Sequence, residues 1–198
     1  MRTLLRRLPA AVALSGLALM SVAARAADAR DDVFKAYQKL MASRFAVDIS
    51  TTGDSGTMKS HGEYDTVDRI HFRNDKMEMI VVPEGTWMKT GQDWMQPPMD
   101  MSGMVKQFVP KSIEDLRGMT KNAADLGATT RNGQGVHAYS YDVDTTVMGI
   151  HVTSTNRIFL NAAGQIVHAE SDGEAMGHKS HTAQDIRYDD SIRVTPPK

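Results

Sequence analysis

The residues Gly62 to Trp94, GEYDTVDRIHFRNDKMEMIVVPEGTWMKTGQDW, carry the pattern that decides the fold. Apolar and polar residues alternate with a period of two, as in RIHFR at residues 69–73. This period is typical of a strand with one buried face and one solvated face. Turn residues interrupt the pattern at Asn74–Asp75 and at Glu84–Gly85. The stretch therefore predicts antiparallel strands joined by hairpins, with one dry side and one wet side to the sheet.

The same pattern extends on both sides of this stretch. From Phe45 to Pro97 it predicts four to six strands. Farther along, Asn132–Gly133 marks another hairpin, and three more strands follow residue 147, with turns at residues 162–164 and 173–177. The chain thus contains two meanders of strands.

Helical patterns flank the meanders. Residues 27–44 place apolar side chains on one helical face, which predicts an amphipathic helix. A second helical section is expected from Met104 until Pro110 ends it, and a short helix is expected to start at Ser112. We expect an α+β fold: a curved antiparallel β half-barrel with helices capping its concave apolar face.

The N-terminus has the features of an export signal. Residues 1–26 contain early arginines, a short apolar run and the small-residue site ARA at residues 24–26. This predicts a signal peptide cleaved after Ala26, a periplasmic location, and a single domain over residues 27–198. Removing four arginines from the 23 basic residues leaves 19 against 24 acidic residues, a formal charge of −5. Such a chain has little long-range attraction for nucleic acid. The absence of cysteine excludes disulfides and argues against a lipid anchor.

Motifs of enzymes and metal sites give weak signals. GDSG at residues 53–56 resembles a protease nucleophile motif, but no histidine precedes His61, so we interpret Ser55 as a turn residue. Asp142 and Asp144 lack the rest of a calcium loop. We therefore expect a non-enzymatic protein without a cofactor.

A methionine-rich segment supplies the main candidate site. Four methionines lie within ten residues beside Trp94 and two prolines. The apolar residues that crowd this part of the chain are Trp87, Met88, Trp94, Met95, Met99, Met101, Met104 and Phe108. Either they pack helices onto the sheet, or they form an adaptable lid over an apolar ligand.

Two further hypotheses stay open. The thioethers of Met99, Met101 and Met104 are soft ligands, so the protein is alternatively a copper(I)-handling protein, with or without His178 and His181. In the other alternative, the apolar segment docks onto an inner-membrane or outer-membrane protein partner.

The order of the segments resembles the periplasmic lipoprotein-carrier superfamily, which includes LolA-like and LppX-like proteins. The resemblance rests on GEYDTVDRIHFRN, EMIVVPEGTWMKTGQDW, LGATTRNGQGVHAYSYDVD and NRIFLNAAGQIVHAES. It implies that lipid or lipoprotein acyl chains, or a similar apolar molecule, bind between the concave sheet face and the helices. The residues that it implies for this site are Ile70, Phe72, Trp87, Met88, Met95, Met99, Met101, Met104, Val105, Phe108, Tyr139, Tyr141, Ile158 and Leu160. Trp94 is a further candidate for ligand contact, because it belongs to the apolar segment described above.

Overall fold

The computed structural model describes residues 17–97, 113–147 and 149–197, which form eleven strands and two helices. The helices are α1 (Leu17–Met41) and α3 (Ile113–Met119). The first meander is β1 (Phe45–Gly53), β2 (Gly56–Thr66), β3 (Arg69–Asn74), β4 (Glu78–Val82), β5 (Gly85–Thr90) and β6 (Asp93–Met95). The second is β7 (Thr120–Arg131), β8 (Gln134–Val147), β9 (Ile150–Leu160), β10 (Ile166–Ala175) and β11 (His178–Tyr188).

All the strands belong to one antiparallel sheet with the order β6-β5-β4-β3-β2-β1-β11-β10-β9-β8-β7. Each meander is built from neighbouring hairpins, and the pairing of β1 with β11 joins the two meanders from Phe45↔Tyr188 to Gly53↔Ser180. The chain therefore runs outward to the β6 edge, crosses to the β7 edge and returns to the centre. The predicted turns at residues 74–75, 84–85 and 132–133 are confirmed.

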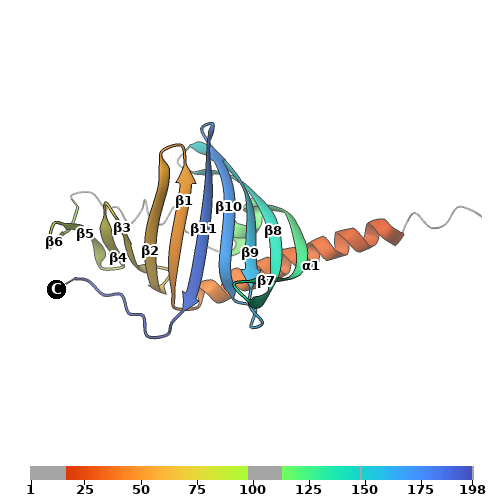
Figure 1. Cartoon of the computed structure of the whole chain (residues 1–198), viewed down its shortest axis with the longest axis horizontal. Coiled ribbons are helices and arrows are strands. Elements are labelled where there is room, and N and C mark those ends of the chain that lie inside the picture. The colour runs from red at the N-terminus through yellow and green to blue at the C-terminus, as the bar shows by residue number, and fades with distance from the viewer. Residues whose placement is uncertain (1–16, 98–112, 148, 198) are drawn as a thin grey trace, which may run out of the picture.

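Helix α1 packs against one face of this sheet, which we call the inner face. Figure 1 shows α1 behind strands β7 to β10, on the concave side of the curved sheet. Val33, Phe34 and Ala36 of α1 are buried in one cluster with the inner-face residues Val47 and Ile158. The spacing of the buried residues follows one side of a helix, as the sequence predicted. The predicted half-barrel with helices on its concave face is confirmed.

The opposite, outer face is charged along most strands, but part of it is apolar and covered. Ile192 and Val194 of the C-terminal segment are buried against Ala46, Ile80 and Val82. Figure 1 shows this segment leaving β11 and running toward the β4 to β6 edge. The expectation of one dry side and one wet side therefore holds for β3 but not for β4, because chain from beyond β11 supplies apolar side chains to its outer face.

The helix predictions have mixed outcomes. The amphipathic pattern at residues 27–44 lies in α1, which ends at Met41, and the short helix expected from Ser112 is α3, which begins at Ile113. The helix expected from Met104 lies outside the described residues. Neither of the two described helices is long and apolar enough to cross a membrane.

Candidate functional site

Two rows of side chains cross the inner face through cross-strand pairing. Residues that pair directly in a sheet present their side chains to the same face, so each row can be followed from strand to strand. The methionine row consists of Ile186, Val47, Gly62, Phe72, Met79, Met88 and Met95. The tyrosine row consists of Tyr188, Phe45, Tyr64, Ile70, Val81 and Thr86.

Both rows start in the core beneath α1 and continue onto the part of the sheet formed by β2 to β6, which we call the wing. In the wing, Ile70, Met79 and Val81 are buried, whereas Phe72 and Met88 are half-buried. Met95, at the sheet edge, is 53 % exposed. None of the described residues of the two rows is charged. The wing therefore carries a continuous apolar strip whose exposure rises from Met79 to the edge.

A glycine gives the strip its shape near the core. An added Cβ at Gly62 would lie 3.0 Å from Cε2 of Tyr64 and 3.3 Å from Cγ1 of Val47. The ring of Tyr64 covers this position and stacks on Phe45, with ring centroids 4.5 Å apart. The absence of a side chain at Gly62 thus allows the aromatic pair to lie flat on the sheet.

Beneath α1, the inner face is filled by protein. Tyr139, Tyr141, Ile158 and Leu160 are buried in the core cluster with α1. The hydroxyl oxygens of Tyr37 and Tyr141 lie 2.6 Å apart and share a hydrogen bond. Burial raises the pKa of Tyr141 well above its usual value. The structure therefore separates these four predicted contact residues from the wing, because α1 occupies the space above them.

Toward the hairpin tips, beyond the α1 core, the inner face changes character. The hydroxyl groups of Thr51 and Thr182 share a hydrogen bond over 3.0 Å. The side-chain amide of Asn156 donates a hydrogen bond to the hydroxyl of Ser154 over 2.9 Å. Ile49 and these four residues are half-buried. This end of the face is lined by small, uncharged and largely polar side chains at the positions named.

Trp87 and Trp94 take a different place from the other predicted residues. By alternation with Met88 and Met95 they lie on the outer face, where they pack on the cluster that contains Ile192. The structure therefore does not bring these two residues to the wing strip. Their burial partners come from the end of the chain, a contact that local sequence patterns do not report.

Five of the predicted residues belong to a part of the chain that the structure does not describe. Met99, Met101, Met104, Val105 and Phe108 lie outside the described residues. Met79 and Val81 belong to the strip although they were not predicted. The alternation in EMIVV at residues 78–82 could have identified them, since Met79 and Val81 share the face of Phe72 and Ile70.

The two histidines of the metal hypothesis have separate carboxylate partners. Nδ1 of His178 lies 2.7 Å from Asp54, and Nδ1 of His181 lies 2.8 Å from Asp172. Residues three apart on a strand point to opposite faces. Within the part of the chain that the structure describes, no three His, Asp or Glu residues are arranged to hold a metal ion.

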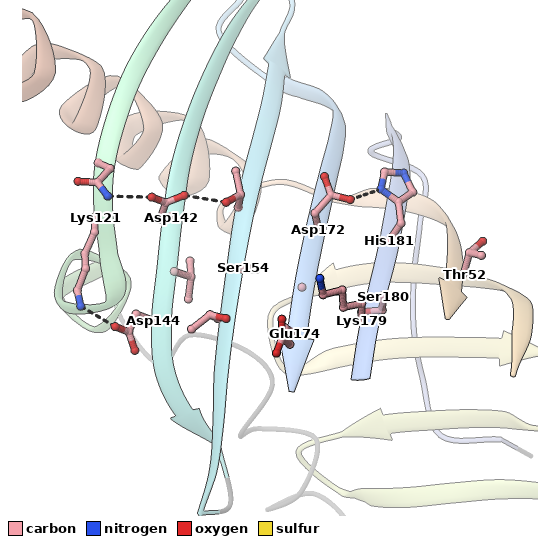
Figure 2. Close-up of a pocket in the computed structure, with 15 residues that line it drawn as sticks. Thr52, Lys121, Asp142, Asp144, Ser154, Asp172, Glu174, Lys179, Ser180 and His181 are labelled. Atoms are coloured by element: carbon pink, nitrogen blue, oxygen red, sulfur yellow. Dashed lines mark hydrogen bonds and ion pairs between the residues drawn. The ribbon is translucent and has the colours of Figure 1, made fainter. Parts of the chain in front are cut away.

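A polar hollow of about 640 Å³ lies over strands β7 to β11. Figure 2 shows its charged side chains, with Asp172 bonded to His181 and Lys121 bonded to Asp144. Oδ1 of Asp142 accepts a hydrogen bond from Thr155 over 2.9 Å. Lys121 and His151 lower the pKa of Asp144 through hydrogen bonds. Asp142 and Asp144, which lack the rest of a calcium loop, are thus hydrogen-bonded groups on the outer face, Asp144 exposed and Asp142 half-buried.

Comparisons with known proteins define the class of fold. No family model matches the sequence, and no curated protein matches it. The structure is similar to LprF from Mycobacterium bovis, with a TM-score of 0.54 and 10% identity over 86% of this chain and 97% of that chain. It is also similar to the lipoprotein LppX of Mycobacterium tuberculosis, with a TM-score of 0.53 and 12% identity over 91% and 100% of the two chains.

A third similar structure is a complex of MucA and MucB from Pseudomonas aeruginosa. The TM-score is 0.50 and the identity 10%, over 81% of this chain and 57% of that chain. At these identities the likeness concerns the fold. The open half-barrel has the same fold as LppX and LprF, so the resemblance seen in the sequence is confirmed at the level of the fold.

Proposed function

We propose that this protein is a non-enzymatic carrier that binds a lipid acyl chain or a similar apolar ligand against the inner face of the wing. The observation that carries the proposal is the uncharged methionine row, which reaches from the core to the exposed sheet edge through Phe72, Met79, Met88 and Met95. Methionine is unbranched and polarizable, so this surface can fit flexible chains of different shape.

The proposed contacts are limited to one side of the sheet. Ile70, Phe72, Met79, Val81, Met88 and Met95 form the strip of the wing. Ile70, Met79 and Val81 are already buried, so binding would be driven by removing the exposed apolar surface of Phe72, Met88 and Met95 from water. This is worth about 25 cal/mol per Å² before the entropic cost of association. The fold shared with the lipoprotein LppX agrees with the sequence resemblance from which this binding role is inferred.

The setting of this activity is also a proposal. The predicted signal peptide would direct the chain to the periplasm, with cleavage after Ala26. Free hydrocarbon chains are poorly soluble in water, so a protein that shields them would be needed to move them through that compartment. The alternative, docking to a protein, is supported by the likeness to MucB, which is solved in a complex with MucA.

Native mass spectrometry of the protein purified from periplasm without detergent tests the proposal. We expect the mass of a chain that begins at Ala27, together with an adduct that organic solvent extracts. Met88→Gln should reduce the occupied fraction at least about tenfold, because it places an amide in the middle of the strip.

The matched control is Lys89→Gln. Lys89 is the next residue on β5 but points to the outer face, where it pairs with Glu78 at 3.0 Å. This variant should keep the adduct. An apolar adduct that persists equally in both variants would contradict binding at the wing, and a wild-type protein free of any adduct would contradict the carrier proposal.

A further inference from the structure

Three hairpin tips meet at one end of the half-barrel. The registers place Gly53–Gly56, the pair Val147↔Ile150 and Ala175–His178 at this end, because β1, β11, β10, β9 and β8 are neighbours. Figure 1 shows the tips of β1–β2 and β10–β11 together at the upper side of the view. The turn between β2 and β3, which contains Val67, lies at the opposite end.

The β10–β11 turn holds a methionine in an unfavourable backbone conformation. Met176 has a φ of 53° and is followed by Gly177 with a φ of 78°. The β7–β8 turn has the same geometry, with a φ of 50° at Asn132 and 78° at Gly133. Asparagine is well suited to this left-handed conformation, whereas methionine gains nothing that offsets the close contact of its Cβ with the backbone. Met176 therefore lowers the stability of its turn relative to asparagine.

The side chain of Met176 also finds no cover within the described protein. It is 75 % exposed, the most exposed of the large apolar side chains in the described residues. A residue that is strained in the backbone and exposed in the side chain is not explained by folding. We take this combination as a sign that the side chain acts outside the molecule.

A second apolar side chain lies on the neighbouring tip. Ile150, on the β8–β9 hairpin, is 38 % exposed. Together with Met176 it borders a hollow of about 560 Å³ between the tips. The tips carry no lysine or arginine, and their one carboxylate, Asp54, lies 2.7 Å from Nδ1 of His178. Glu174 and His151 border the hollow itself, and Glu174 lies opposite Lys179 in the register.

We propose that these tips dock onto the surface of a lipid membrane, with Met176 and Ile150 inserted among the lipids. The proposal rests on the proposed function, because a carrier of apolar chains must exchange its ligand with a membrane. Two side chains on separate turns offer far less than the roughly 800 Å² per partner of a stable protein interface. Two such side chains fit a shallow, reversible insertion, and the absence of lysine and arginine from the tips favours zwitterionic over anionic lipid headgroups.

The test is co-sedimentation of the full-length mature protein with phosphatidylcholine vesicles. Met176→Asn copies the sequence of the β7–β8 turn, so its melting temperature should equal or exceed that of the wild type. Its vesicle partition coefficient should fall at least about tenfold, since burial of one such side chain contributes more than a factor of ten. Val67→Asn is the matched control: Val67 is 45 % exposed at the opposite end and should show unchanged partition.

Several results would overturn the proposal. Wild-type protein that stays in solution with the vesicles, equal binding by Met176→Asn, or an equal loss in Val67→Asn would each do so. Sedimentation that shows a dimer lost in Met176→Asn would assign the tips to self-association instead. Native mass spectra of the same variants separate the two proposals: an apolar adduct retained by Met176→Asn leaves the carrier function intact even where docking fails.

Discussion

At the residue scale, the inner face depends on a few positions where the space for a side chain is fixed. Gly62 is the clearest, since its neighbours Tyr64 and Val47 lie within 3.3 Å of an added Cβ. Tyr64 stacks on Phe45 with ring centroids 4.5 Å apart, which limits its movement, and the burial of its phenol raises its pKa. A side chain at this glycine should therefore disturb the stacked rings of Phe45 and Tyr64, which lie between the core and the wing.

We expect Gly62→Val to lower the free energy of unfolding by about 1–3 kcal/mol, because it overpacks a closely fitted site. Denaturant unfolding measures this difference. Gly135→Val is the control, since an added Cβ there meets no atom within 4 Å and valine suits a strand. A Gly62→Val protein as stable as the wild type would show that Tyr64 can leave the stack at little cost.

At the element scale, the C-terminal segment that follows β11 and carries Ile192 and Val194 covers part of the outer face, and we call it the strap. Val194 donates its backbone N–H to Asp65 over 3.3 Å and accepts a hydrogen bond from Arg69 over 3.3 Å. The guanidinium of Arg44 lowers the pKa of Asp65, and the Val194 N–H adds to this effect. The strap thus combines apolar burial of Ile192 and Val194 with fixed backbone contacts.

Val194→Asp should lower the free energy of unfolding by about 3 kcal/mol, because it buries an unpaired carboxylate in an apolar cluster. Both tryptophans of the chain pack on this cluster, so their fluorescence emission should shift to the red. Thr195→Asp changes the next, exposed residue and should leave the spectrum as it is. An unshifted Val194→Asp spectrum would contradict the strap.

At the scale of the whole molecule, the tyrosines link stability to pH. All five tyrosines of the chain have a raised pKa, caused first by burial. For Tyr139 and Tyr188 the pKa is about 12, against an ordinary value of 10.0. The unfolded chain therefore loses these protons at lower pH than the folded protein does.

The raised pKa values of the tyrosines should make the folded protein less stable at high pH. The stabilising contribution of the buried neutral phenols is complete below pH 10 and is lost as the pH rises toward 12. We expect the melting temperature to fall over this interval, with phenolate absorbance appearing together with loss of the sheet signal in circular dichroism. Phenolate absorbance of all five tyrosines near pH 10 in a protein that stays folded would refute this coupling.

The sequence by itself determined the strands, most of the turns and the fold class, because the period of two and the turn residues act over a few positions. It also predicted that Ile70, Phe72 and Met88 lie on the concave face of the sheet, where the strand register places them. Only the tertiary structure decided which apolar positions remain available. Helix α1 covers Tyr139 and Tyr141.

The strap, from the far end of the chain, covers the outer face at Trp87 and Trp94. Alternation reports that a strand has an apolar face, but what covers that face depends on pairings between residues more than one hundred positions apart, such as Phe45 with Tyr188. Those contacts are set by the path of the whole chain.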